Sequence, residues 1–451
     1  MESEVESLIK NTIISFNECN LKLGRTLLAP KLLRQYSRDK QERNKNRLKH
    51  VLHLYEWAYS AIANPSSGIL ASIAHKISQF KIVKWFRQLI REKVYHFWTK
   101  IWISNETDEL AVPPFDSINH LYEDFRKITL DALRKIQIMD PTFTSSEKLK
   151  AMRVVWFSIY WEWFCDPSSE AVSEQFPLVQ LIGLGLWCVY TDSFIDNPRY
   201  SRVEIDNFIS IVNSMIYFQP TSIYDKGIFS PRLMAHLKNA ISMMHDNHSP
   251  HNEIFKSLSL LNEAQNSDQL KLSDIVNPKV DLNEILYLSC RKGFLALYTA
   301  SLIVNNKRVI KKELEEYLAS FGLFIQLLDD LQDVEEDLAQ NKTTVFTFLI
   351  KQGKALDELI SNLLNFIENI KIDKIINGIN EKDKVRLFYL DATFKRGFMI
   401  LVLEAIGKLD KKYFTCEFFN HVNSYCPWPL EGSHQIPNIE ATLLQVIELG
   451  L

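Results

Sequence analysis

The sequence predicts an all-α protein, and three observations lead to that class. The chain has 451 residues, of which 46% are hydrophobic, enough for a substantial core. Only 13 glycines and 15 prolines interrupt it, and the alternation of apolar and polar residues that marks a half-buried strand is scarce. Long segments instead repeat their apolar residues at helical spacing. We therefore expect a helical protein.

Charge, cysteines and the N-terminal residues restrict the class of protein further. The formal net charge is −3, so overall charge gives no case for a nucleic-acid partner. The six cysteines are scattered, without a CxxC pair or a zinc-type spacing. The first residues are acidic and lack the apolar core of a signal peptide, and the longest apolar run, 178–190, is too short to span a bilayer. We expect a cytoplasmic protein.

A change of composition near residue 110 predicts two regions. A polar stretch that ends in two prolines, residues 104–114, separates them. Residues 1–110 are expected to form an N-terminal helical extension of unknown role, rich in aromatic and basic side chains at 81–98. That mixture is typical either of packing against the following domain or of contact with a membrane surface. Residues 111–451 are expected to form the main helical domain.

Helical periodicity and boundary residues predict the elements of the main domain in order. The segment that begins near 176 is strongly apolar, and Pro198 ends it. The segment from 282 carries apolar and small residues as far as Leu302. The segment 310–339 has an apolar stripe on one side and acids on the other. The expected helices cover residues 117–139, 146–165, 173–196, 202–217, 231–246, 282–304, 310–339, 355–371, 382–409 and 411–424.

The most informative residues lie in the segment 327–337. Asp329, Asp333 and Asp337 are four residues apart, so in a helix their carboxylates would drift across one face, about 6 Å apart along the axis. Such a row suits Mg²⁺, which takes one or two carboxylates and fills its other positions with water and phosphate oxygens. Taken alone, however, the row is explained better by a solvated acidic helix face.

A second pair of acids supports the metal interpretation. Asp192 and Asp196 are again four residues apart, at the end of the apolar segment 176–196. A carboxylate among such apolar neighbours is costly unless it is paired, hydrogen-bonded or bound to a metal. Facing helices of an α-bundle are where such metal sites form. The alternative is a helix end that frays into a polar loop, with Asp192 in water.

Cationic side chains complete the candidate site. Arg291 and Lys292 are adjacent within an otherwise apolar segment. A diphosphate held by Mg²⁺ needs neutralising charge from the protein, which either residue supplies. A surface pair whose charged ends reach water is the alternative. Lys342 and Arg199, close to the two acidic motifs in the sequence, are further candidates for diphosphate binding.

Together these residues resemble the class I isoprenoid synthase superfamily, which comprises terpene cyclases, trans-prenyl diphosphate synthases, and squalene and phytoene synthases. Residues 324–337 are similar to the second aspartate-rich motif of that superfamily, and residues 191–198 resemble the first motif in its DxxxD form. The segment Arg291–Lys292–Gly293 falls where prenyl synthases carry a diphosphate-binding Lys-Thr pair, with glycine in place of threonine. The resemblance covers roughly residues 115–410.

The resemblance implies a helical bundle around a central active-site cavity, and Mg²⁺ as cofactor with Mn²⁺ as the alternative. The implied metal ligands are Asp192, Asp196, Asp329, Asp333 and Asp337. The implied diphosphate ligands are Lys292, Arg291, Lys342 and Arg199, and the catalytic set is Asp192, Asp196, Asp329, Asp333 and Lys292. Aromatic residues near the motifs would line the cavity, although core packing is the simpler explanation for any one of them. They are Phe164, Trp187, Tyr190, Phe194, Phe321 and Phe324.

The implied function is that of a terpene synthase, which ionises a linear prenyl diphosphate, releases diphosphate, and cyclises or quenches the carbocation. A prenyl transferase, either head-to-head or chain-elongating, is the alternative. The stretch from Met152 onward contains nothing like the isopentenyl-diphosphate site of chain elongators, which favours the single-substrate cyclase. A non-catalytic helical interaction protein is the second alternative. The expected partner is a small prenyl diphosphate and not a nucleic acid, with a homodimer and peripheral membrane contact left open.

Overall fold

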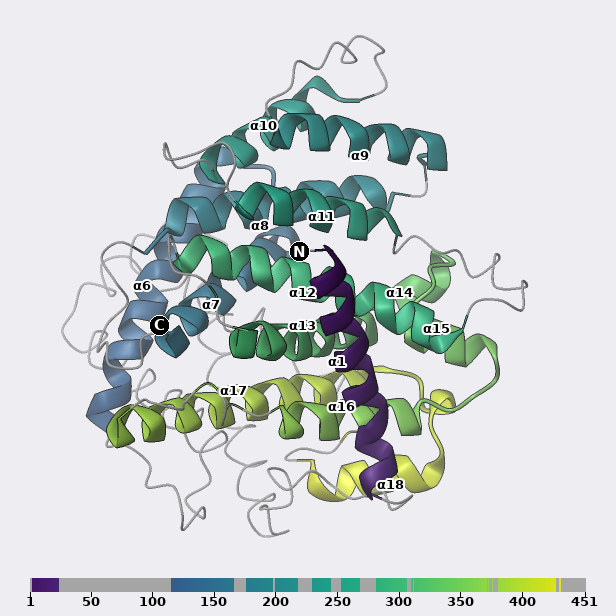
Figure 1. Cartoon of the computed structure of the whole chain (residues 1–451). Helices are drawn as coiled ribbons and strands as arrows, with labels where there is room; N and C mark the ends of the chain where they lie inside the picture. Colours follow the sequence, from purple (N-terminus) through teal and green to yellow (C-terminus); the bar gives the residue numbers. More distant parts are fainter. Residues whose placement is uncertain are drawn as a thin grey trace, which may run out of the picture. The chain divides into compact units, whose positions relative to one another are not determined.

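The computed structural model describes residues 2–23, 115–165, 176–217 without 198, 229–244, 253–267, 281–305, 312–370 and 380–426, with a few single positions besides. Every element within these ranges is a helix (Figure 1). The all-α class expected from the sequence is therefore confirmed. Most of the predicted N-terminal extension, including its aromatic and basic segment, lies outside the described residues.

The observed helices follow the predicted ranges closely, with a few differences. Their bounds are α1 Glu2–Leu23, α6 Phe115–Met139, α7 Ser145–Cys165, α8 Leu178–Ile195, α9 Arg202–Ile216, α10 Pro231–Met244, α11 Glu253–Ser267, α12 Leu282–Asn305, α13 Lys312–Gln332, α14 Val334–Ala339, α15 Val345–Lys351, α16 Asp357–Asn369, α17 Glu381–Lys408, the 3₁₀ helix η3 Lys411–Tyr413 and α18 Cys416–Tyr425. The single helix predicted for 310–339 was wrong, because the chain turns at Asp333 between α13 and α14. The helix predicted for 411–424 is likewise divided into η3 and α18. Neither α11 nor α15 was predicted.

The described residues fall into two compact units. The first contains α1, the helices from α6 to α16, the start of α17 as far as Asp391, and residues 409–415. The second contains Ala392–Lys408 and α18. All the predicted metal and diphosphate ligands belong to the first unit. The domain boundary expected near residue 110 stays a prediction.

The helix α8 is central to the first unit. It packs between α7 and α10 (Figure 1), with side chains such as Leu181 and Trp187 fully buried. By length and composition it is also the one described helix that could cross a membrane. However, 67% of it is buried inside the protein, which is typical of a core helix. This burial explains why the sequence between residues 178 and 190 is almost entirely apolar.

The helix α11 packs against α9 and α12, although its sequence is not clearly amphipathic. Polar side chains occupy part of its buried face and find partners on the neighbouring helices. The hydroxyls of Ser257 and Thr299 lie 2.7 Å apart, and the amide of Asn262 donates to the carbonyl of Ile209 at 3.0 Å. Because these polar residues interrupt the apolar stripe, periodicity alone misses the helix.

The helix α1 is part of the first unit even though it begins the sequence. It packs against α12, α13 and α16 (Figure 1). Its apolar face is buried through Ile9, Ile13 and Phe16. The ring of Phe16 meets that of Phe366 edge-on, with centroids 5.2 Å apart. Residues 2–23 therefore complete the core of the unit that carries the candidate site.

Candidate functional site

The three acids of the second motif keep helical spacing across the junction of α13 and α14. The backbone N–H of Asp333 donates to the carbonyl of Asp329 at 3.1 Å, and that of Asp337 donates to the carbonyl of Asp333 at 2.8 Å. The turn at Asp333 is slight, with φ −101° and ψ 11°. The three residues therefore follow one another along one side of the α13–α14 segment, and we refer to them as the acid row.

A left-handed turn after α14 brings the chain back toward the acid row. Asn341 has a φ of 59°, a conformation that asparagine tolerates better than most residues. The N–H of Lys342 donates to the carbonyl of Asp337 at 2.8 Å, and that of Asn341 donates to Leu338 at 3.2 Å. This pair of bonds defines a Schellman motif. It places Lys342 directly after the reversal, beside Asp337.

The ammonium group of Lys342 joins the two acidic motifs. Its Nζ lies 3.4 Å from Oδ2 of Asp196, at the end of α8, and 3.8 Å from Oδ1 of Asp337 on α14. The side chain of Asp337 is only 7% exposed, so solvent and salt screen this contact less than they screen a surface ion pair. Two motifs far apart in the sequence therefore meet at one positive charge.

The helix α7 contributes a second cation, which sequence reasoning missed. Arg153 Nη1 lies 2.6 Å from Oδ1 of Asp329, and its Nη2 donates to Oε1 of Gln332 at 3.2 Å. The positive charge of Lys150, one turn earlier on α7, also acts on Asp329 and Asp333. The available signal was the spacing of Lys150 and Arg153 by one turn, directly before the almost wholly apolar second half of the same helix.

The charge environment changes along the acid row. Although burial alone would raise the pKa of Asp329, Arg153 and Lys292 hold it below its usual value. Burial, together with the charge of Asp329, raises the pKa of Asp333 to about 6. Burial also raises the pKa of Asp337 to about 7, despite the opposing charge of Lys342. The far end of the row therefore lacks enough positive charge, and an added cation would be favoured there.

The acids of the first motif lie on the last turn of α8. The backbone N–H of Asp196 donates to the carbonyl of Asp192 at 2.9 Å, so the helix is intact at this point. Oδ1 of Asp192 accepts a hydrogen bond from Gln265 on α11 at 2.9 Å. Burial raises the pKa of Asp192, while Lys292 opposes the rise and Asp196 adds to it. The fraying considered for this helix end does not occur.

The remaining predicted cations have different surroundings. The charge of Lys292 acts on both Asp192 and Asp329, so it reaches both acidic motifs. The neighbouring Arg291 instead lies 3.8 Å from the carboxylate of Glu263 on α11. Arg199 is exposed in the turn that follows α8. Within the described ranges, we find no ion pair between Arg199 and either acidic motif.

Two glycines allow α12 and α13 to touch through their backbones. A methyl group on Gly293 would lie 2.1 Å from the carbonyl oxygen of Gly322, far inside normal contact. A methyl group on Gly322 would lie 2.6 Å from the carbonyl carbon of Gly293. The crossing has no room for a side chain, and it brings Lys292 close to the helix that carries the acid row. This contact accounts for glycine where the resemblance leads one to expect threonine.

Asp330 is adjacent to the acid row but belongs to the interface between α12 and α13. Its side chain is 7% exposed and accepts hydrogen bonds from Gln326 at 2.8 Å and from Ser289 at 3.5 Å. Helical geometry therefore gives the two neighbouring acids of the sequence different partners, and Asp329 is the one that pairs with Arg153.

The carboxylate groups of the two motifs are of the type that binds a hard divalent cation, although they do not converge on one point. Among the residues that the structure describes, no three Asp, Glu, His or Cys side chains meet closely enough to hold a metal ion. Carboxylate oxygens are nevertheless the ligands that Mg²⁺ prefers. The ammonium of Lys342, between Asp196 and Asp337, stands in for a cation at this point. The residues therefore fit Mg²⁺ by chemistry and charge.

Two of the six aromatic residues predicted to line a cavity lie in a layer of rings between α7 and α13. Phe164 stacks on Tyr317 with centroids 5.0 Å apart, and Phe321 lies 6.3 Å from Phe157. We call this set the aromatic layer; its members are Phe157, Tyr160, Trp161, Phe164, Tyr317 and Phe321. All six side chains are buried.

A short chain of hydroxyl groups runs through the aromatic layer. Tyr317 donates its hydroxyl hydrogen to Oδ1 of Asp391 at 2.9 Å, so Tyr160 is the donor in the 2.9 Å bond between the two hydroxyls. Burial, reinforced by the charge of Asp391, raises the pKa of both tyrosines well above the usual value. Both tyrosine hydroxyls therefore stay protonated and hydrogen-bonded, whereas the buried indole N–H of Trp161 in the same layer has no hydrogen-bond partner among the residues that the structure describes.

The other four predicted lining residues are also buried, and they are Trp187, Tyr190, Phe194 and Phe324. Phe194 stacks on Tyr200 and on Phe208, with centroids 4.0 Å apart in each case. Trp187 and Phe324 are fully enclosed, and the hydroxyl of Tyr190 is used in a polar network. The role of these residues as cavity lining stays a prediction.

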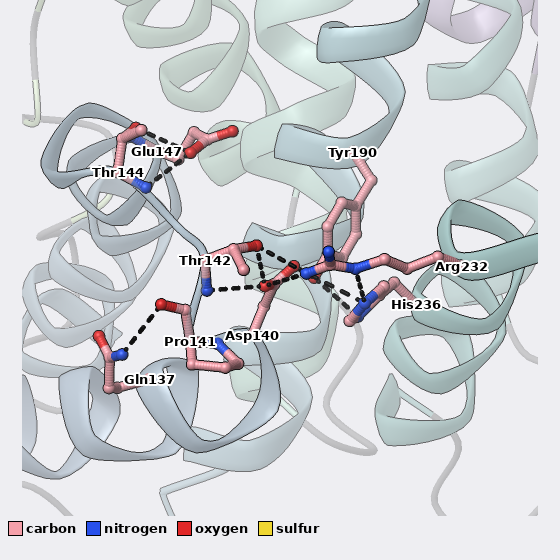
Figure 2. Close-up of polar contacts among 9 residues, drawn as sticks. All are labelled: Gln137, Asp140, Pro141, Thr142, Thr144, Glu147, Tyr190, Arg232 and His236. Atoms are coloured by element: carbon pink, nitrogen blue, oxygen red, sulfur yellow. Dashed lines mark hydrogen bonds and ion pairs between the residues drawn. The ribbon is translucent and has the colours of Figure 1, made fainter. Parts of the chain in front are cut away.

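That polar network centres on Asp140, in the turn between α6 and α7 (Figure 2). The hydroxyl of Tyr190 on α8 donates to Asp140 Oδ2 at 3.1 Å and lies 3.2 Å from Nδ1 of His236 on α10. Arg232 Nη2 and the N–H of Thr142 donate to Asp140 Oδ1 at 3.1 and 3.0 Å. The network therefore joins the last turns of α8 to α10 and to the α6–α7 turn.

Asp140 is ionised at neutral pH within this network. Burial alone would raise its pKa, but the hydrogen bonds from Thr142 and Tyr190 outweigh burial and lower it. Tyr190 precedes Asp192 by two residues, so the network and the first acidic motif lie on different sides of the same turns of α8. Through its hydrogen bond with Tyr190, Asp140 therefore helps to hold the side of α8 opposite the first acidic motif.

Comparisons with known proteins add a likeness to solved structures. No family model matches this sequence, and no curated protein matches it. Among solved structures, one match is the linalool/nerolidol synthase from Streptomyces clavuligerus in complex with 2-fluorogeranyl diphosphate. The two chains are 14% identical, the match covers 61% of this chain and 92% of that one, and the TM-score is 0.38. At that level of likeness, function has to be argued from the residues of this chain.

Proposed function

We propose that this chain is a class I isoprenoid synthase and, more specifically, a terpene synthase that ionises a linear prenyl diphosphate with Mg²⁺. The observation that carries the proposal is the meeting of two acidic motifs at the ammonium of Lys342. Arg153 and Lys292 add positive charge at the same acids. Carboxylates that favour a metal ion, next to cations that favour an anion, suit a diphosphate bound together with Mg²⁺.

The cations would bind and orient the diphosphate. Negative charge develops on the leaving oxygen as its bond to carbon breaks, and fixed positive groups stabilise that charge. Arg153, Lys292 and Lys342 would serve in this role, whereas Arg291 is engaged with Glu263. Mg²⁺, or Mn²⁺ as the alternative, would act as a Lewis acid on the diphosphate oxygens. Its ligands would come from Asp192, Asp196, Asp329, Asp333 and Asp337.

The hydrocarbon chain would lie toward the apolar interior. Phe157 follows Arg153 by one turn of α7, so the aromatic layer begins roughly 6 Å along the helix axis from that cation. Ionisation sends both electrons of the carbon–oxygen bond to the diphosphate and leaves an allylic carbocation. Desolvated aromatic faces stabilise a cation by about 0.5–2 kcal/mol each, and buried rings exclude water until the cation is quenched. Loss of a proton would yield a hydrocarbon, and capture of water an alcohol.

The test is a product assay on the purified full-length chain. Geranyl, farnesyl, geranylgeranyl and geranylfarnesyl diphosphate are supplied singly with Mg²⁺, diphosphate release is measured, and the organic phase is analysed by gas chromatography. Release from a single substrate with a hydrocarbon or alcohol product supports a terpene synthase. Release that requires isopentenyl diphosphate, or condensation of two allylic diphosphates, means a prenyl transferase instead. No release from any substrate contradicts the proposal.

Variants connect the activity to the site. Asp192→Asn and Asp329→Asn should each slow diphosphate release on the order of 100-fold, because each removes a charged oxygen donor. Asp131→Asn is the matched control, since Asp131 is a half-exposed acid of α6, paired with Arg134, and loses the same charge. Its rate should stay within about twofold of the original, as expected for an exposed surface substitution.

A further inference from the structure

Arg153 and Lys342 act as internal counterions of the acidic motifs. The guanidinium of Arg153 lies 2.6 Å from Asp329, and the ammonium of Lys342 lies within 4 Å of both Asp196 and Asp337. These are oxygens that a metal ion would need. A carboxylate oxygen that holds a protein cation has to give up that contact before it can bind a metal ion. The two cations therefore compete with Mg²⁺ for the same acids.

We propose that Arg153 and Lys342 couple the binding of Mg²⁺ to the binding of diphosphate. This inference rests on the proposed function for the identity of the two ligands, and goes beyond it in assigning their interdependence to two side chains. Each ligand alone binds weakly, because the two protein cations already contact the carboxylates of Asp329, Asp196 and Asp337. Both together bind well, because the diphosphate takes the two cations and the acids become free for the metal.

Electrostatics explains why neither ligand is enough. Mg²⁺ alone would displace the ammonium of Lys342 from Asp337 and leave the two like charges near each other in a partly buried place, which is unfavourable. Diphosphate alone would draw the cations away and face uncompensated carboxylates. When both bind, each displaced cation gains charge-assisted hydrogen bonds to phosphate oxygens. By linkage, each ligand raises the affinity of the other by the same factor.

The two cations have the freedom that this exchange requires. The side chains of Lys342 and Arg153 are 22% and 33% exposed, so their charged ends can turn toward a ligand without opening the core. Both are long and flexible, and Lys342 follows directly on the Schellman turn at Asn341. Asp337, in contrast, is almost fully buried. In the contact between Lys342 and Asp337, the lysine is therefore the side chain that can move.

The test measures binding rather than turnover. Isothermal titration calorimetry gives the affinity of the full-length chain for Mg²⁺ alone, for methylenediphosphonate alone as a stable diphosphate probe, and for each in the presence of the other, after correction for the complex that Mg²⁺ and the diphosphonate form without protein. We expect the wild type to show positive coupling on the order of 10- to 100-fold, within the usual range for linked sites. Independent binding of the two ligands would overturn the proposal.

Replacing Lys342 with a neutral residue distinguishes this coupling from an ion pair that only stabilises the fold. Lys342→Gln should bind Mg²⁺ alone several-fold more tightly, because the competitor is gone, and should bind the diphosphonate more weakly, so the coupling factor falls toward one. Lys342→Arg should keep the coupling. Lys412→Gln is the matched control, since Lys412 is an exposed lysine paired with Asp410 at 2.9 Å. It should match the wild type in all three affinities.

The outcomes are distinguishable from those of the product assay. If Lys342→Gln remains folded by circular dichroism and binds Mg²⁺ alone no better than the wild type, the inference is overturned even when the chain turns over prenyl diphosphates. If Lys342→Gln does not fold, Arg153→Gln at the other end of the acid row supplies the same comparison. Coupling without any prenyl diphosphate turnover would support the inference and contradict the proposed reaction.

Discussion

Replacing Asp140 with asparagine removes one negative charge from the polar network behind α8 and hardly changes side-chain shape. The carboxylate accepts hydrogen bonds from the N–H and the hydroxyl of Thr142 at 3.0 and 2.5 Å, from the hydroxyl of Tyr190 at 3.1 Å, and from Arg232 at 3.1 Å. An asparagine side chain has one acceptor oxygen and one amide group. The amide would face groups that are themselves donors, so part of the network must break.

The expected loss of stability in Asp140→Asn depends on how exposed the hydrogen-bond partners of Asp140 are. Arg232 is 58% exposed, so its contact with Asp140 adds little. The bonds from Thr142 and Tyr190 to the buried carboxylate remain, and a hydrogen bond to a charged group contributes about 1.5–3 kcal/mol. Because such contributions are not additive, we expect Asp140→Asn to lower the free energy of unfolding by about 2–4 kcal/mol near neutral pH.

The stability difference between wild type and Asp140→Asn should decrease as the pH falls. The folded pKa of Asp140 is lowered because the bonds from Thr142 and Tyr190 outweigh burial. A carboxyl with a lowered folded pKa stabilises the protein above its unfolded pKa, about 3.9, and this contribution disappears as the pH falls through the folded pKa. The stability difference between wild type and Asp140→Asn should therefore shrink below about pH 4.

Urea unfolding of both proteins, followed by circular dichroism at several pH values, measures the difference. Asp131→Asn provides a matched control, since Asp131 is a half-exposed acid of α6 in an exposed ion pair with Arg134. Its stability should change by less than about 0.5 kcal/mol. Equal unfolding midpoints for wild type and Asp140→Asn near neutral pH would refute the reasoning, and so would a difference that persists unchanged in acid.

Further substitutions at four positions test the local geometry. Gly293→Ala should force α12 and α13 apart, because its methyl group would lie 2.1 Å from a carbonyl oxygen. We expect stability to fall by about 1–3 kcal/mol in thermal unfolding and diphosphate release to slow. An unchanged melting temperature would contradict the backbone contact. Asn341→Gly should preserve the left-handed turn, whereas Asn341→Val should cost about 1–2 kcal/mol at a φ of 59°; equal unfolding temperatures for the two variants would disprove this account of the turn. Tyr317→Phe removes the donor to Asp391 and should lower the free energy of unfolding by about 1–3 kcal/mol in urea. Tyr160→Phe should cost less, and the reverse order would contradict the direction of the hydroxyl chain.

The helices were predictable where apolar residues repeat regularly. The expected ranges 117–139 and 282–304 differ from α6 and α12 by only a residue or two at either end. The helix α11 was missed because buried serine and asparagine side chains replace apolar ones on its inner face. The helix α15 spans only seven residues, too few for periodicity to show. Its capping box pairs Thr344 with Thr347, where glutamate or glutamine is the usual signal.

Within the candidate site, only the arrangement of residues along each helix could be predicted from the sequence. Spacing by four residues indicated which acids share a face, and the helical hydrogen bonds of the acid row agree with it. The contact of Arg153 with Asp329 was not predictable, because the two residues are 176 positions apart and one arginine on a helix usually faces solvent. Lys342 was a candidate, but its position between the motifs depends on the turn at Asn341. The roles of these residues stay predictions until the assays are done.

The packing of α1 has a consequence for synthesis on the ribosome. The helix precedes all its packing partners, and Asn17 bonds to a residue 266 positions downstream. At about 5–20 residues per second, α1 would wait roughly 15–50 seconds for that partner. During this time the apolar face formed by Ile9, Ile13 and Phe16 would be in water. A nascent chain would therefore present an uncovered helix to chaperones until its later helices emerge.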